Sequence, residues 1–276
     1  MLGKLLKYEV KAAGKVIPVL YLGIGLAYLL GKLAAVLHVA QMKTGLAVIC
    51  LCMGAAAILL ALILAVLRYA KGLFGSEGYL AQTLPVGKGT LLASKMIAGY
   101  LLILLGIVGL LLGLAGMMDL FELGNIWELL VSGLGDMFLP LLILLGAGGL
   151  IQMFSTLSTV YFAVTLSNTK PFLSNNVLFA VVFYLAGSTV VGLVELASML
   201  LLPIGIRLSG DGGLTLTFES MLLDLIKNPE LWGSSQDLAV FEHMSLGLGS
   251  VIADLAVGIF LLFITRWLLT RKIAVK

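Results

Sequence analysis

The sequence predicts an all-α polytopic membrane protein, and three observations support this fold class. Hydrophobic residues make up 61% of the 276 residues and charged residues only 11%, whereas about a quarter of a water-soluble domain is charged. Six apolar runs each exceed the ~20 residues with which a helix crosses the ~30 Å hydrocarbon core, and none shows the alternation of a barrel strand. Lys and Arg residues are also distributed unevenly between the connections.

The six predicted transmembrane helices cover, in chain order, residues 16–36, 46–67, 96–118, 137–166, 177–204 and 246–269. The first run follows four lysines, as the core of a secretory signal would. It is nevertheless longer than a usual signal core, ends at Lys32 without a persuasive small-residue cleavage site, and precedes five more spans. We therefore expect this helix to be retained and residues 1–276 to form a single transmembrane domain.

Positive charge predicts the orientation of the chain. Thirteen of the seventeen Lys and Arg residues fall in alternate gaps, and such residues near span ends favour the cytoplasmic side. The thirteen are Lys4, Lys7, Lys11, Lys15, Arg68, Lys71, Lys88, Lys95, Lys170, Arg266, Arg271, Lys272 and Lys276, and the other four are Lys32, Lys43, Arg207 and Lys227. We expect a multi-pass protein of the plasma membrane with both termini in the cytoplasm.

Two segments outside the spans are predicted to lie at the membrane surfaces. At 100° per residue, the four lysines of residues 1–15 share one sector opposite the leucines, which predicts an interfacial amphipathic helix ahead of the six spans. The extracellular segment 205–245 contains a stretch at 217–226 whose apolar residues share one helical face, namely Phe218, Met221, Leu222, Leu225 and Ile226. This stretch is expected to lie on the outer membrane surface.

Motifs for nucleotide or acyl chemistry are absent from the sequence. A phosphate-binding P-loop needs G-x-x-x-x-G-K followed by Ser or Thr, but here Gly87 and Lys88 precede Gly89, and the position of the first glycine holds Gln82. The two histidines, His38 and His243, lie in outer connections and cannot complete a Ser, His and acid set. We expect no enzymatic activity or catalytic residues, no cofactor on this chain, and no nucleic-acid partner.

The two cysteines give no metal site. Cys50 and Cys52 lie two residues apart inside the second run, so on a helix they point to different faces, and no histidine or further cysteine lies near them. We expect both to act as small apolar fillers. In the third span, Gly106, Gly109, Gly113 and Gly116 mark one side of the helix, which predicts close helix packing.

Polar residues within the spans form the candidate translocation path. Gln152, Ser155, Thr156 and Thr159 recur at i, i+3, i+4 and i+7, so the fourth helix carries one polar stripe. The stripe either makes interhelical hydrogen bonds, worth about 0.6 kcal/mol each, or lines the path. Glu195 and Asp254 lie in the fifth and sixth spans, where an ionised group needs water or a partner. Glu195 and Asp254 either contribute to the translocation path or form a buried pair with a structural role.

The second cytoplasmic connection has more aromatic and aliphatic residues than a solvated loop needs. Residues 68–86 read Arg-Tyr-Ala-Lys-Gly-Leu-Phe-Gly-Ser-Glu-Gly-Tyr-Leu-Ala-Gln-Thr-Leu-Pro-Val, and residues 91–95 read Leu-Leu-Ala-Ser-Lys. Together with Leu-Leu-Lys-Tyr-Glu-Val-Lys-Ala at 5–12, this stretch resembles permease subunits of type-2 ABC exporters of Gram-positive bacteria. The plan of the whole chain is similar too, although Lys170 alone supplies the positive charge after the fourth span.

The resemblance implies partners and a coupling segment at 68–95. In that family two permease copies, identical or different, form the path, and two copies of a separate ATPase bind ATP and Mg. The residues that would rest in a groove of the ATPase are Leu73, Phe74, Gly75, Ser76, Glu77, Gly78, Tyr79 and Leu80. Phe74 and Tyr79 would be apolar anchors and Glu77 a charged contact. Without the resemblance, the same residues fit a loop whose rings lie among lipid headgroups.

The expected function is therefore that of a non-enzymatic transmembrane subunit of an ATP-driven exporter in the lipid bilayer. Its substrate would be amphiphilic, such as a peptide, an antibiotic or a lipid. One alternative is an ion- or proton-coupled secondary carrier in which Glu195 and Asp254 titrate, although no inverted repeat with paired broken spans is evident. Another is a peptide-sensing or immunity protein that binds a peptide with its outer segment and transports nothing.

Overall fold

Six long helices dominate the structure, a computed structural model that describes residues 3, 17–75, 87–124, 128, 131–132, 138–208, 214–227 and 245–271. Each is long and apolar enough to cross a membrane. They are α2 (Ile17–Val36), α3 (Ala40–Phe74), α5 (Lys88–Leu120), α7 (Phe138–Ser167), α8 (Asn176–Leu201) and α11 (Gly249–Arg271). The predicted helical, multi-pass membrane protein is confirmed at this level. The interfacial helix predicted at 1–15 lies, apart from Gly3, outside the described residues.

The surfaces of these helices are apolar. Large hydrophobic side chains are exposed on all six, including Leu22, Leu111, Ile143, Leu193 and Phe263, and α8 has no buried residue among those described. A water-soluble monomer rarely exposes a contiguous apolar surface of this extent. The side chains therefore face lipid or another protein, as transmembrane helices do.

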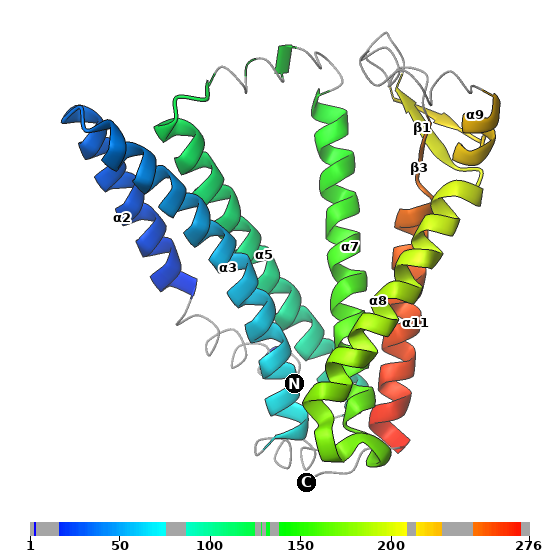
Figure 1. Cartoon of the computed structure of the whole chain (residues 1–276). Helices are drawn as coiled ribbons and strands as arrows, with labels where there is room; N and C mark the ends of the chain where they lie inside the picture. Colours follow the sequence, from blue (N-terminus) through cyan, green and yellow to red (C-terminus); the bar gives the residue numbers. More distant parts are fainter. Residues whose placement is uncertain are drawn as a thin grey trace. The chain divides into compact units, whose positions relative to one another are not determined.

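The described residues fall into two compact units, and the first comprises residues 1–129 and 268–276. In it α2, α3 and α5 pack against one another, as Figure 1 shows. At 1.5 Å per residue, the 35 residues of α3 and 33 residues of α5 make helices about 50 Å long, well beyond the ~30 Å hydrocarbon core. Both helices continue past the apolar runs that predicted them.

The connection predicted at 68–95 is consequently helical at both of its ends. Helix α3 continues to Phe74 and α5 begins at Lys88. The sequence supports this continuation, because Ala70, Lys71 and Leu73 all favour helix. The proline at position 85 lies outside the described residues and beyond the end of α3.

Small residues allow α3 and α5 to approach closely. Ala47, Cys50, Gly54, Ala57, Ala61 and Ala65 recur along one buried face of α3, and the four predicted glycines of α5 are buried opposite them. The prediction of a packing face at Gly106, Gly109, Gly113 and Gly116 is confirmed. Cys50 is buried and Cys52 is exposed, so the two thiols do lie on different faces of the helix.

The closest approach gives a stability prediction. A Cβ atom at Gly113 would lie 2.6 Å from Cys50 O and 2.9 Å from Gly54 Cα, and neither backbone atom can move without shifting a helix. We expect Gly113→Ala to destabilise the protein by about 1–3 kcal/mol, the usual effect of overpacking. The thermal midpoint of unfolding in detergent measures the change.

Gly45→Ala is the matched control for this substitution. A Cβ at Gly45 meets nothing within 4 Å, and alanine favours helix more than glycine does, so this variant should be as stable as the wild type or more so. Equal thermal midpoints for Gly113→Ala and the wild type would contradict the observed packing.

The second unit, residues 130–267, contains α7, α8 and most of α11. A 3-10 turn, η2 (Lys170–Asn175), joins α7 to α8, and the two helices pack along each other. Phe172 in η2 contacts Phe179 and Phe183 of α8, with ring centroids 4.9 and 5.0 Å away. Helix α8 ends at Leu201, before the predicted end at residue 204, because Pro203 disfavours helix at the residue before it.

A small antiparallel sheet follows α8 and was not predicted from the sequence. Its strands β1 (Gly205–Leu208), β2 (Leu214–Thr217) and β3 (Ser245–Gly247) lie in the order β2-β1-β3. Figure 1 shows the sheet beside the end of α8, together with the short helix α9 (Met221–Lys227). The helix predicted at 217–226 is therefore shorter than expected, because its first residue, Thr217, belongs to β2.

Candidate functional site

The predicted polar residues of the second unit come from three helices. Gln152, Ser155, Thr156 and Thr159 lie on α7, Glu195 lies on α8, and Asp254 lies on α11. Ser155, Thr159 and Asp254 are buried, whereas Thr156 and Glu195 are half-buried. The hydroxyl groups of Thr156 and Thr159 donate to carbonyl groups one turn back in α7, so both oxygens stay available as acceptors.

Contacts between helices join most of these residues. The amide Nε2 of Gln152 donates to Glu195 Oε1 over 3.3 Å. The carboxyl group of Asp254, only 2% exposed, is adjacent to the Glu195 carboxyl and the Ser155 hydroxyl. Among the described residues, Asp254 Oδ1 and Ser155 Oγ have no partner at hydrogen-bonding distance. The structure thus gathers the predicted path residues at one place, with two buried oxygen atoms unsatisfied.

A cavity of about 120 Å³ lies between α7 and α8 at this place. Besides all four residues of the α7 stripe, its lining includes Tyr184, Ser188 and Glu195. At about 30 Å³ per molecule, the cavity has room for a few waters or a small polar group. Tyr184 and Ser188 were not among the predicted residues. They lie eleven and seven residues before Glu195, at helical spacing, and this periodicity is the signal that could have found them.

The electrostatics of this cavity favour positive charge. Two neighbouring carboxyl groups in a medium of low dielectric constant cannot both ionise without a counter-charge. None of the residues that line the cavity is Lys, Arg or His. A proton or a cation that reaches the cavity would supply such a counter-charge. We call this set of residues, Gln152, Ser155, Thr156, Thr159, Glu195 and Asp254, the acidic site.

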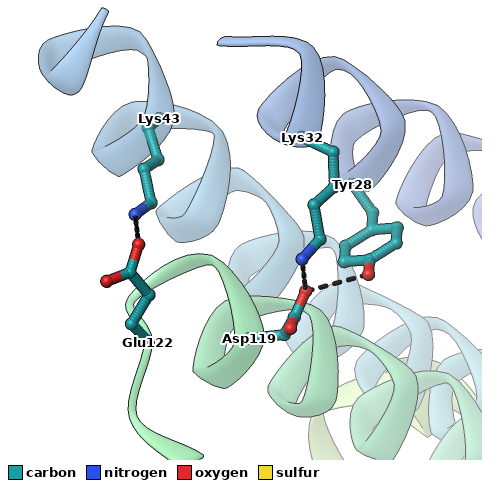
Figure 2. Close-up of polar contacts among 5 residues, drawn as sticks. All are labelled: Tyr28, Lys32, Lys43, Asp119 and Glu122. Atoms are coloured by element: carbon teal, nitrogen blue, oxygen red, sulfur yellow. Dashed lines mark hydrogen bonds and ion pairs between the residues drawn. The ribbon is translucent and has the colours of Figure 1, made fainter. Parts of the chain in front are cut away.

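A second polar cluster, which the sequence did not reveal, lies at one end of the first unit (Figure 2). Lys32 Nζ pairs with Asp119 Oδ2 over 2.5 Å, and the Tyr28 hydroxyl donates to the same oxygen over 2.8 Å. Lys43 Nζ donates to Glu122 Oε1 over 2.5 Å. These contacts tie the ends of α2 and α3 to the end of α5 and the residues after it.

The ion pairs border a cavity of about 690 Å³ whose other lining is mainly apolar, including Leu111, Leu114 and Met118. Side chains of the pairs are exposed to different degrees, from 22% for Lys43 to 81% for Glu122. Such exposure weakens each attraction through solvent screening. We interpret the cluster as a set of polar contacts that hold the ends of α2, α3 and α5 together.

The hydrogen bond from Lys43 holds the pKa of the Glu122 carboxyl below its ordinary value of 4.5. A carboxyl whose pKa is lower in the folded state stabilises the fold above the unfolded pKa, and this stabilisation disappears as the pH falls through the folded pKa. The contribution of Glu122 is therefore present at neutral pH, begins to fall near pH 4.5, and is lost below the lowered pKa of the folded carboxyl. It is small, because the side chain is exposed.

Asp119 is expected to matter more than Glu122, because its carboxylate accepts from two groups. Asp119→Asn should lower the thermal midpoint at pH 7 more than Glu122→Gln does. The difference between Glu122→Gln and the wild type should shrink as the pH falls below 4.5 and vanish below the lowered pKa of the folded Glu122 carboxyl, where the wild-type side chain also becomes neutral. Thermal unfolding of both variants at several pH values provides the measurement. An Asp119→Asn variant as stable as the wild type would show that the cluster does not fasten the helices.

The predicted coupling residues are described only in part. Leu73 is 2% exposed, and Phe74 lies edge-on to the buried Tyr69, with ring centroids 6.2 Å apart. The Gly75 amide donates to Lys71 O and closes α3. The side chain of Leu73 is thus packed inside this protein in this conformation and is not exposed to a partner. The remaining predicted residues, 76–80, lie outside the described residues, so their docking role stays a prediction.

Both helices that border this segment are anchored in the first unit. Lys95 of α5 lies against Gly72 of α3, since a Cβ at Gly72 would be 2.4 Å from Lys95 Nζ. Lys88, the first residue of α5, donates from Nζ to Leu269 O near the end of α11, over 3.0 Å. A displacement of residues 76–86 would therefore act directly on two packed helices.

No family model, curated protein or solved structure matches the chain. The class of protein follows from the structure itself: a multi-pass α-helical membrane protein with an acidic site among three of its spans.

Proposed function

We propose that this chain is the transmembrane permease subunit of an ATP-driven exporter. It moves an amphiphilic substrate outward across the plasma membrane, and a separate ABC-type ATPase that binds ATP and Mg supplies the energy. The sequence of residues 68–95, which include the end of α3 and the start of α5, carries the proposal. The resemblance of residues 5–12 and the six spans support it.

The geometry of α3 and α5 fits a coupling role. Both helices extend past their apolar runs and hold each other through close packing of small residues. Packed interiors transmit displacement because they deform little. When the ATPase closes on ATP, a push on residues 76–86 would shift α3 and α5 together. This displacement would move the first unit as a whole.

The remaining parts of the proposal concern orientation and assembly. Both termini and the coupling segment lie in the cytoplasm, as the positive-inside rule favours. A second permease copy, identical or different, completes the path, and the exposed apolar faces of the helices offer surface for it. The ion pairs of Lys32 and Lys43 then lie at the extracellular end of the first unit.

The acidic site favours one alternative, a proton- or ion-coupled secondary carrier. Adjacent carboxyl groups within a membrane are common in proton relays, and the pair of Glu195 and Asp254 has this arrangement. A carrier would work without an ATPase and stop when the ion gradient is collapsed. An exporter would continue under an ionophore as long as ATP is present.

Co-purification of an ATPase tests the proposed function. The tagged permease, extracted from its native membrane in mild detergent, should bring down an ATPase, and the complex should hydrolyse ATP. The permease alone should show no saturable hydrolysis, because its sequence has no P-loop. Hydrolysis by the pure subunit, or a permease that purifies without an ATPase under several mild conditions, would count against the proposal.

A further inference from the structure

The polar cavity beside Glu195 adjoins a larger apolar cavity in the same unit. This second cavity measures about 420 Å³ and is lined from α7, α8 and α11 by residues that include Phe162, Phe183 and Phe260. Thr159 and Val191 line both cavities. Pockets of 300 to 1,000 Å³ with apolar walls and a few polar groups are typical ligand sites. The two adjoining cavities have this composition, with polar groups at one end only.

The polar end offers acceptors and negative charge. Ser155 lines the polar cavity and is 1% exposed, and its hydroxyl oxygen has no hydrogen-bond partner among the described residues. Glu195 lines the same cavity, and the buried carboxyl of Asp254 is adjacent to the Glu195 carboxyl. No Lys, Arg or His lines either cavity. Leaving the buried Ser155 oxygen unpaired is costly, and a ligand that brings donors and a positive charge would pair with it and with the Glu195 carboxylate.

We propose that the second unit binds an amphiphilic organic cation. Its ammonium group lies in the polar cavity against Glu195 and Ser155, and its apolar body lies among Phe162, Phe183 and Phe260. A primary ammonium has three donors, which suits one carboxylate and neighbouring hydroxyl or amide oxygens. Asp254 does not line either cavity, and its carboxyl is adjacent to that of Glu195. Such a cation would be the substrate class of the proposed exporter. Binding of the cation does not depend on that function, and only its export rests on it.

A fluorescent amine provides the test. Dansylcadaverine carries an aromatic body and a primary ammonium, and its N-acetyl derivative has the same body without the charge. Both are titrated into the purified permease in nanodiscs of zwitterionic lipid at pH 7, without ATPase or ATP. We expect saturable binding of the amine and about tenfold or more weaker binding of the acetyl derivative, because hydrogen bonds to charged groups contribute 1.5–3 kcal/mol.

Variants locate the two ends of the ligand. Glu195→Gln should weaken binding of the amine about tenfold or more while leaving the acetyl derivative unchanged. Val191→Phe should weaken both ligands, since Val191 lies where the cavities meet. Glu128→Gln, at an exposed acid, and Leu193→Phe, at a position of α8 that is 63% exposed, are the matched controls and should change neither affinity.

Two results would overturn the inference. One is equal affinity of the wild type for the amine and its acetyl derivative, which requires no variant. The other is unchanged amine affinity in a folded Glu195→Gln variant. Because binding is measured on the permease alone, its failure is distinct from failure of the export function, which shows itself as the absence of an ATPase partner. Saturable amine binding by a permease that has no ATPase partner would support the cation site and contradict the proposed exporter function.

Discussion

Replacing Phe74 and Tyr79 together with alanine is expected to release the ATPase from the permease and abolish most ATP-driven export. Each ring buried in a groove of the partner would contribute about 1.5–3 kcal/mol. Loss of both would therefore weaken the assembly by two orders of magnitude or more, at about 1.4 kcal/mol for each factor of ten. The ATPase should keep its basal hydrolysis, because its own active site is untouched.

The structure refines the design of this experiment. Phe74 lies at the end of α3 and contacts Tyr69, so its loss can also loosen that helix end. Tyr79→Ala alone therefore isolates the docking contribution, and it should account for a large part of the effect. Phe121→Ala is the control, since Phe121 follows α5 in the first unit and is 39% exposed. Co-purification and substrate efflux are measured for each variant.

Unchanged co-purification and efflux in the double variant would contradict the assignment of residues 68–95 as the segment that couples the permease to the ATPase. Residues 68–95 would then be an ordinary interfacial connection, with its rings among lipid headgroups. A double variant that no longer folds is recognised by its thermal midpoint. In that case Tyr79→Ala, which leaves Tyr69 and Phe74 in place, decides between docking and folding.

Neutralising the acidic site is expected to stop transport without disturbing the ATPase. Glu195→Gln and Asp254→Asn keep the size of each side chain but remove a charge from the low-dielectric interior. If the acidic site holds a cationic group during export, Glu195→Gln should lose about tenfold or more of the transport rate, in line with 1.5–3 kcal/mol for a hydrogen bond to a charged group. Asp254→Asn should lose less, because Asp254 is adjacent to Glu195 but does not line the cavity. Co-purification of the ATPase and its basal hydrolysis should remain at wild-type levels.

Stability measurements separate this role from structural pairing. Removing a buried charge that lacks a counter-ion should leave the fold as stable as before or stabilise it. Glu128→Gln removes one acid from an exposed position and serves as the control. Wild-type transport in both acidic-site variants, or failure of both to insert and fold, would assign Glu195 and Asp254 to structural pairing.

Patterns within a single helix could be predicted from the sequence. The glycine face of α5 and the polar stripe of α7 both follow helical spacing, and the structure shows both. The spans themselves were predictable because apolar length is a direct requirement of the bilayer. The true ends of α3 and α5 were not, since hydropathy falls at the membrane surface while helix propensity continues beyond it.

Contacts between helices could not be predicted in the same way. Tyr28 and Asp119 lie 91 residues apart in the sequence, and span positions give depth in the membrane but not which faces meet. For the same reason, Glu195 and Asp254 could be named as candidates, but their adjacency came only from the structure. The sheet was missed because strands of three and four residues are too short for a reliable alternation of apolar and polar residues.

ATP-driven transport in reconstituted vesicles is the most direct measurement of the proposed function. The permease and the ATPase that co-purifies with it are placed in proteoliposomes together with an amphiphilic amine such as dansylcadaverine, and ATP is supplied on the side where the ATPase lies. An exporter should move the amine away from that side only when ATP is hydrolysed, and collapse of the ion gradients should not stop it. Transport that needs an ion gradient but no ATPase, or no transport by the assembled complex, would contradict the account.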